Sequence, residues 1–153
     1  AIAARAAAVP GAFFTILCLV TGSIWGRPAW GTWWEWDGRL TSMLILFFVY
    51  VAYIALSQSM QSTAANTRML AIFGVIGTIN LPIIHGSVIW WNSLHQPPSI
   101  TSGGSAIAGP ILWPLAVTLT GFTALFAAII LMRMRAILAD AKTEARMRRM
   151  AEG

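Results

Sequence analysis

The sequence has little charge and almost no cysteine. Only 10% of its 153 residues are charged, and its mean hydropathy is +0.72. A soluble domain carries about a quarter charged residues, so this composition excludes a soluble globular protein. Cys18 is the only cysteine and lies in an apolar segment. Its isolation excludes an intrachain disulfide, a paired-cysteine redox site, a cysteine-based zinc site and a two-cysteine haem attachment motif within this chain.

Signatures of nucleotide hydrolysis and of serine hydrolases are also missing. The chain has no glycine-rich phosphate loop after a strand and no set of serine, histidine and aspartate for nucleophilic catalysis. We therefore expect no enzyme activity here, and any ATPase that drives the protein is a partner chain. The net charge of +5 is concentrated after residue 132, where six of the ten basic residues fall. Such a segment indicates a cytoplasmic tail at a lipid bilayer, and no nucleic-acid partner.

Long runs without charge predict membrane-spanning helices. They cover residues 6–26, 40–67 and 69–132, and a polar segment rich in proline and glycine divides the third at residues 92–110. A helix needs roughly 20 apolar residues to cross a bilayer. We therefore predict an all-α, polytopic membrane protein that forms a single domain over residues 1–153. Its four spans are expected at about residues 6–26, 40–57, 69–91 and 110–132, with a loop at the polar run 57–63.

The basic tail predicts the orientation of these spans. Residues 133–153 are expected in the cytoplasm by the positive-inside rule. An even number of spans then places residues 27–39 and 92–110 together on the outer face, which is the periplasm in a Gram-negative host.

The first outer connection is unusually rich in tryptophan. Residues 30–39 hold four of the eight tryptophans, Trp30, Trp33, Trp34 and Trp36, and Trp90 and Trp91 end the third span on the same side. Lipid anchoring explains one or two indoles at a membrane edge. A cluster of this size favours a platform for a flat apolar ligand. Porphyrin fits this requirement, and a lipid or quinone head group fits nearly as well. If the stretch is helical, Trp30, Trp33, Trp34 and Asp37 share one face.

Charged residues flank this platform. Asp37 is expected to cap the second span by accepting hydrogen bonds from its first free N–H groups. Arg27 and Arg39 lie on the outer side, against the positive-inside trend. They are expected to pair with Glu35 or Asp37, or with an anionic group of a ligand.

The two histidines are candidate ligands of iron. His85 lies within the third span, where an ionisable group suits either ligation or a hydrogen bond to a neighbouring helix. His95 follows Trp90 and Trp91 in an outer loop. Because neutral imidazole is a common axial ligand of haem iron, the aromatic surroundings make His95 the stronger candidate.

Several of these motifs resemble one family. The run from Trp30 to Ser42 is similar to the WWD signature of haem-handling proteins, in the form found in haem exporter protein C of the bacterial cytochrome c maturation system (the CcmC family). Related families typically continue Asp-Pro and an acidic residue, whereas Asp37 is followed here by Gly-Arg-Leu-Thr-Ser. Further similar stretches are residues 20–26, 80–85, 90–96 and 131–135.

The resemblance implies a multi-pass protein of the bacterial inner membrane. It would bind haem b non-covalently at the periplasmic face, with His95 as one axial ligand, and deliver it to a periplasmic haem chaperone for cytochrome c biogenesis. The implied partners are the ABC-type ATPase and membrane subunits of the same system and a small single-span subunit. The implied haem-contacting residues are Trp30, Trp33, Trp34, Trp36, Asp37, Arg39, His95, Trp90, Trp91 and Arg27.

The sequence also departs from the family pattern. The family has six spans and a second axial histidine in an earlier helix, so we expect this chain to correspond to the last four spans, without the first two. His85 is the only substitute ligand that the chain offers. Pro97 stands where the family has glycine. Two alternatives stay open: a lyase-type subunit that attaches haem to cytochrome c, and a haem or quinone anchor subunit of a respiratory complex.

Overall fold

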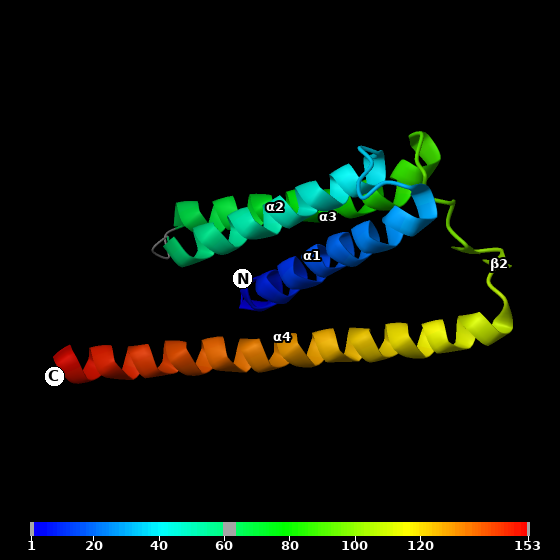
Figure 1. Ribbon diagram of the computed structural model, residues 1–153. Helices are drawn as coiled ribbons and strands as arrows, with labels where there is room; N and C mark the ends of the chain where they lie inside the picture. The colour runs from blue at the N-terminus through cyan, green and yellow to red at the C-terminus, as the bar shows by residue number, and fades with distance from the viewer. Residues whose placement is uncertain (1, 60–63, 153) are drawn as a thin grey trace.

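The part of the chain that the structure describes folds into four long helices and one small hairpin. In the computed structural model, residues 2–59 and 64–152 are described. The helices are α1 (Ile2–Trp30), α2 (Gly38–Ser59), α3 (Ala64–Trp90) and α4 (Gly109–Glu152), and strands β1 (Ile100–Thr101) and β2 (Gly104–Ser105) form the hairpin. Consecutive helices run in opposite directions (Figure 1). Within the described residues, four helices are long and apolar enough to cross a membrane, which confirms the predicted fold class.

Each predicted span lies within or nearly within one helix, but the helices are longer than the charge-free runs. Residues 57–59 of the predicted loop belong to α2, because polar side chains are compatible with a helix that leaves the apolar layer. Residues 60–63 of that loop lie outside the described residues. The tail from residue 133 continues α4 as helix to Glu152.

The ends of α1 and α2 are set by local chemistry. Gly31 has φ of +80°, and its N–H donates to the carbonyl of Arg27 at 3.1 Å. This left-handed glycine terminates α1, because other residues rarely adopt that conformation. Asp37 starts α2 by accepting a hydrogen bond from the N–H of Leu40 at 2.8 Å, as predicted for a cap. Residues 31–37 between them are irregular, so the predicted shared helical face does not form.

Small and polar residues hold the first three helices together. Ala6, Ala8 and Ala12 of α1 are buried, as expected where membrane helices approach closely. Between α2 and α3, the side-chain amide of Asn80 donates to the carbonyl of Ser42 at 2.8 Å. This hydrogen bond fixes the register of α2 against α3 near the end that carries the tryptophans.

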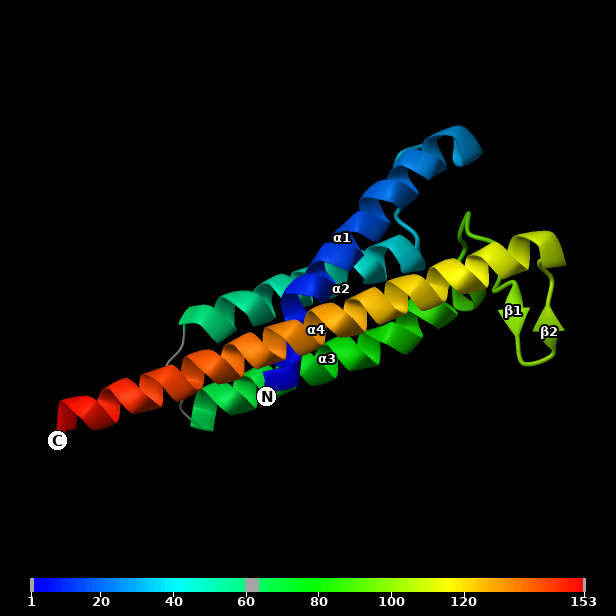
Figure 2. The same cartoon turned by 90° about the horizontal axis from the view of Figure 1, so that it is seen from below.

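Helix α4 packs against α1 on the side opposite α2 and α3 (Figure 1). Figure 2 shows α1 crossing α4 at an angle. The contact includes Phe14, whose ring meets those of Phe122 and Phe126 at centroid distances of 6.2 and 5.6 Å. Arg133 donates from Nε to the carbonyl of Ala6 at 3.1 Å. The C-terminal end of α4 projects past the other three helices (Figure 1).

Candidate functional site

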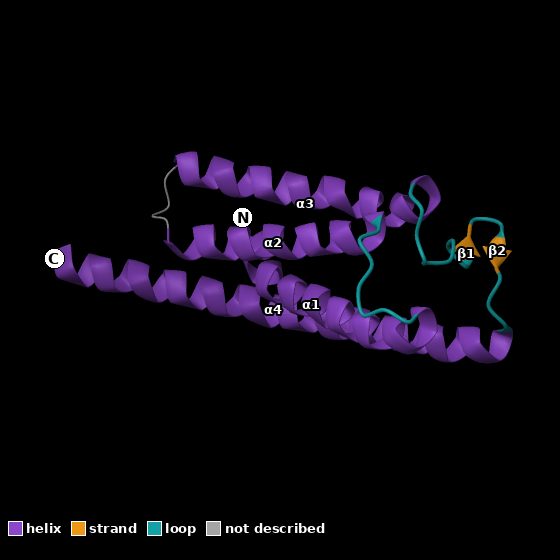
Figure 3. Ribbon diagram, turned by 45° about the horizontal axis from the view of Figure 1, so that its top comes forward, coloured by secondary structure: helices purple, strands orange, loops and turns teal. Residues whose placement is uncertain are grey.

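Both tryptophan-bearing connections lie at the same end of the helices. The segment between α1 and α2 and the loop between α3 and α4 are close together in Figure 3, at the end opposite the two chain termini. This arrangement brings His95, which follows α3, to the segment that precedes α2. The predicted proximity of the tryptophan cluster and His95 is therefore present.

Asp37 is at the centre of the site. Its side chain is only 1% exposed, and both of its oxygens accept hydrogen bonds. Oδ1 accepts from the N–H of Leu40, and Oδ2 lies 2.7 Å from Nδ1 of His95. The Ser93 hydroxyl also donates to Oδ2. The cap of α2 and the candidate iron ligand thus share one carboxylate.

The surroundings of Asp37 keep it ionised. Burial by itself raises the pKa of this carboxyl, but hydrogen bonds from Ser93, Leu40 and His95 outweigh burial and hold the pKa below its ordinary value. A buried negative charge therefore lies against His95. The His95 side chain itself is 19% exposed, so its ring remains accessible to a ligand.

Aromatic rings continue outwards from His95. Trp30 packs edge-on against the imidazole, with ring centroids 4.6 Å apart and an interplanar angle of 71°. Trp25 packs in turn against Trp30 at 5.1 Å. Within the irregular segment, Trp34 and Trp36 are 5.4 Å apart. Trp33 and Trp36 are 57% and 71% exposed, which leaves two indole surfaces of this segment open.

One polar atom of this cluster has no partner. Within the described residues, the buried Nε1 of Trp34 donates to no acceptor. A buried donor left unpaired costs about 1–3 kcal/mol, so such atoms call for an explanation. A ligand that carries acceptor oxygens, such as the carboxylates of a haem, has the chemistry to pair with it.

The two remaining tryptophans of the predicted platform end α3. Trp90 and Trp91 are 73% and 63% exposed. The backbone N–H of Trp91 donates to the carbonyl of Ser87 at 2.9 Å, which extends the helical bonding just beyond the last helical residue. Part of the Trp91 ring lies over Gly38 at the start of α2.

The two outer arginines do not form the predicted pairs within the protein. Among the residues the structure describes, neither Arg27 nor Arg39 forms an ion pair with Glu35 or Asp37. Arg27 instead donates from Nη1 to the carbonyl of Gly31 and so stabilises the end of α1. The pairing prediction is wrong for Asp37 because its acceptors are already occupied by Leu40, Ser93 and His95. The other prediction, an anionic ligand group as the partner of these arginines, is untested.

His85 does not join the site. It lies on an exposed face of α3, roughly 7 Å along the helix axis before Trp90 at 1.5 Å per residue. Across the described part of the chain there is no group of three or more His, Cys, Asp or Glu side chains that could hold a metal ion. Within the described residues, the ring of His95 contacts a tryptophan, at a centroid distance of 4.6 Å from Trp30, and His85 has no such ring contact.

Sequence reasoning missed Ser93, Ser23 and Trp25. Ser23 of α1 donates to the carbonyl of Trp33 at 2.7 Å and ties the irregular segment back to its helix. Ser93 stands two residues before His95, a spacing that lets a hydroxyl accept from a following backbone N–H, and this local signal was available. The contact of Trp25 with Trp30 depends on how α1 ends and had no comparable signal.

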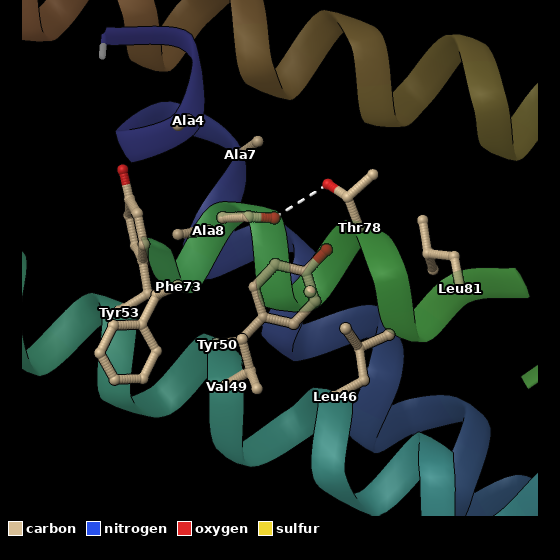
Figure 4. Close-up of a pocket in the computed structure, with 12 residues that line it drawn as sticks. Ala4, Ala7, Ala8, Leu46, Val49, Tyr50, Tyr53, Phe73, Thr78 and Leu81 are labelled. Carbon is tan, nitrogen blue, oxygen red and sulfur yellow. Dashed lines mark hydrogen bonds between the residues drawn. The ribbon is translucent and has the colours of Figure 1, made fainter. Parts of the chain in front are cut away.

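A separate cavity of about 250 Å³ opens among α1, α2 and α3 (Figure 4). Its wall includes Tyr50 and Tyr53 of α2 and Thr78 of α3, whose hydroxyl donates to the carbonyl of Gly74 at 2.9 Å. The residues that line it include no histidine, cysteine or charged side chain. It therefore offers no imidazole or thiolate ligand for iron.

Comparison with known proteins agrees with the WWD-like segment. A family model described as heme exporter protein C matches residues 1–149. The chain belongs to the haem exporter protein C family. The family prediction made from the sequence is confirmed.

Relatives named heme exporter protein C match most of the chain. The one from Bradyrhizobium diazoefficiens is 51% identical over 88% of this chain and 51% of its own length. The one from Escherichia coli K12 is 48% identical over 88% of this chain and 54% of its own length. The one from Paracoccus denitrificans is 41% identical over 99% of this chain and 61% of its own length. The chain thus spans about half the length of the first two relatives.

Proposed function

We propose that this chain binds haem b non-covalently at the periplasmic face of the bacterial inner membrane and passes it to a periplasmic haem chaperone for cytochrome c biogenesis. Haem is here a transported substrate. The observation that carries the proposal is the contact of His95, still partly exposed, with Trp30 and Asp37 at the tryptophan-rich end.

The residues suit this substrate. His95 supplies an imidazole nitrogen to the iron. The exposed indoles of Trp33 and Trp36, with Trp34, Trp90 and Trp91 nearby, supply flat apolar surface for the porphyrin. Arg27 and Arg39 are cations at the same end and suit propionate groups.

The periplasmic side is supported by charge. The extension of α4 carries the basic residues Arg133, Arg135, Lys142, Arg146, Arg148 and Arg149 at the end opposite the tryptophans. By the positive-inside rule that end faces the cytoplasm. The site, being at the other end, then faces the periplasm.

The proposed partners follow from the family. They are the ABC-type ATPase and membrane subunits of the same system, a small single-span subunit and the periplasmic chaperone. The second axial ligand of iron is proposed to come from a histidine outside this chain, because His85 is not brought to His95.

Haem titration of the purified protein, followed by absorbance in the Soret region, tests the site. We expect His95→Ala to weaken binding and shift the Soret band, whereas His85→Ala, which removes the other imidazole, leaves both unchanged. An unaltered band and affinity in His95→Ala would refute the ligand role.

The aromatic platform needs its own variant. An aromatic contact contributes about 0.5–1.5 kcal/mol beyond its buried area, so Trp33→Ala with Trp36→Ala should weaken haem binding by about 1–3 kcal/mol, or roughly 5- to 150-fold. Trp113→Ala is the matched control, because Trp113 is 73% exposed, close to the 71% of Trp36, but lies at the start of α4. Equal affinities in the double variant and the control would remove the platform from the proposal.

A further inference from the structure

The hydrogens around Asp37 can be assigned one by one. An ionised carboxylate only accepts hydrogen bonds. Oδ1 accepts from Leu40 N–H at 2.8 Å, and Oδ2 accepts from the Ser93 hydroxyl. Nδ1 of His95 lies 2.7 Å from the same Oδ2, so it must be the nitrogen that carries a proton.

The hydrogen bonds of Ser93 are consistent with a proton on Nδ1 of His95. Its single hydroxyl hydrogen points to Asp37, and its oxygen accepts the backbone N–H of His95 at 3.0 Å. The Ser93 oxygen also lies 3.1 Å from Nδ1 of His95. Because the hydroxyl hydrogen already bonds to Asp37, Ser93 donates no hydrogen bond to Nδ1. Trp30 packs against the imidazole with the two rings steeply inclined and limits rotation of the imidazole.

We infer that Asp37 and Ser93 are positioning residues that hold the His95 imidazole with a proton on Nδ1, so that Nε2 is the only ring nitrogen able to bind iron. This inference rests on the proposed function, which makes His95 an iron ligand. A carboxylate behind a ligating imidazole also raises the basicity of the ligand, and removing such a partner typically lowers metal affinity 10- to 100-fold. A more basic ligand stabilises ferric over ferrous haem, so the pair also keeps the reduction potential of bound haem low.

Asp37→Asn is the decisive substitution. Asparagine caps helices about as well as aspartate, so α2 should still form. Its side chain has one acceptor oxygen and one NH₂ donor. If the amide oxygen accepts from Leu40 N–H, the NH₂ group faces Ser93 and His95. It can then donate to Nδ1 of His95 only when Nδ1 is unprotonated, so the proton of His95 moves to Nε2. The opposite orientation of the amide loses the cap and is disfavoured.

Nitrogen-15 NMR of the haem-free protein measures the tautomer of His95 directly. With ¹⁵N-labelled histidine the chain shows only two imidazoles, and His85→Gln assigns them. At about pH 8.5, where an ordinary imidazole is neutral, the shifts of Nδ1 and Nε2 distinguish the two tautomers. We expect the Nδ1–H form of His95 in the unsubstituted protein and the Nε2–H form in Asp37→Asn.

Matched controls isolate the two positions. Glu35→Gln removes an exposed carboxylate from the same segment and should leave the tautomer of His95 unchanged. Ser93→Ala removes the acceptor of the His95 backbone N–H, so the ring should leave Oδ2 of Asp37 in part of the molecules and show a mixture of tautomers, whereas Ser102→Ala in the exposed hairpin turn should not. Retention of the Nδ1–H form in Asp37→Asn, or an Nε2–H form in the unsubstituted protein, would overturn the inference.

A second measurement uses haem. Asp37→Asn should bind haem 10- to 100-fold more weakly than Glu35→Gln and should raise the reduction potential of the haem that remains bound. If His95→Ala binds haem normally while the NMR shows the Nδ1–H form, the proposed ligation fails but the fixed tautomer stands. If His95→Ala loses haem while Asp37→Asn keeps the native tautomer, affinity and potential, the ligation stands and the positioning role is refuted.

Discussion

Replacing Gly38 by alanine tests how closely α2 and α3 must approach at the site. A Cβ on Gly38 would lie 2.9 Å from Cβ of Ser87, and 3.4 and 3.5 Å from Cβ and Cδ2 of Trp91. Non-bonded carbons are most favourable at about 3.5–4.0 Å, so the two helices must separate locally by roughly 0.6–1 Å. The Cβ of Ser87 is fixed to its backbone and cannot turn away.

The magnitude follows from two opposing effects. Overpacking of this kind destabilises a protein by about 1–3 kcal/mol. Alanine recovers up to about 1 kcal/mol over glycine in a helix. We therefore expect Gly38→Ala to lower the free energy of unfolding by about 1–2 kcal/mol.

The separation of α2 and α3 should also lengthen the contact between Asp37 and His95. Asp37 precedes Gly38, and His95 follows α3, so a local shift of this size stretches the 2.7 Å contact between Oδ2 and Nδ1 to roughly 3.3–3.7 Å, beyond ordinary hydrogen-bonding range. The tautomer of His95 should become mixed. Thermal unfolding of the solubilised protein and the ¹⁵N spectrum of His95 measure the two effects together.

Two variants sharpen this test. Gly22→Ala, inside α1, is the control, because a Cβ on Gly22 meets nothing within 4 Å; it should raise stability by up to about 1 kcal/mol and leave the tautomer unchanged. Adding Ser87→Gly to Gly38→Ala removes the clashing carbon and should restore the Asp37–His95 hydrogen bond. If Gly38→Ala is as stable as Gly22→Ala and keeps the Nδ1–H form, the close approach of α2 and α3 does not support the site.

Three further predictions concern single contacts. Asn80→Leu removes the hydrogen bond to the Ser42 carbonyl and should destabilise the solubilised protein by about 0.6–1.7 kcal/mol, measured by thermal unfolding; no change would mean that another group fixes the α2–α3 register. Because hydrogen bonds hold the pKa of Asp37 below its unfolded value, its contribution to stability is complete above about pH 4 and disappears as pH falls through the lower folded value. Unfolding between pH 2.5 and 6 should show this loss in the unsubstituted protein and not in Asp37→Asn; identical profiles would contradict it. Arg133→Met removes the hydrogen bond to the Ala6 carbonyl and should increase protease access between α1 and α4, with Arg135→Met, which has no such contact, as the control.

Much of the fold could be predicted because lipid imposes a simple rule on sequence. The charge-free runs predicted the positions of the four helices, but the residues at which the helices begin and end were harder to predict. Arg5 and Arg27 lie inside α1, since a long side chain at a helix end reaches water while its backbone stays helical. The end of α1 depends instead on Gly31, whose left-handed backbone no hydrophobicity pattern reveals.

The candidate site was predicted in part. The cap by Asp37 follows from local chemistry and could be read from the sequence. Its second hydrogen bond joins residues 58 positions apart and depends on the packing of α2 against α3. The prediction that Arg27 pairs with Glu35 or Asp37 was wrong for the same reason: tertiary contacts decide which of the nearby acceptors an arginine bonds.

The length of α4 has a mechanical consequence. It is one unbroken helix, and its contacts with α1 extend from Phe122 to Arg133 near its middle. At 1.5 Å per residue it continues roughly 20 Å from there towards Gly109 and roughly 29 Å towards Glu152. A straight helix supported near its centre is a lever. A sideways push of a few ångströms on its charged end would swing Gly109, where α4 begins, by a comparable distance in the opposite direction.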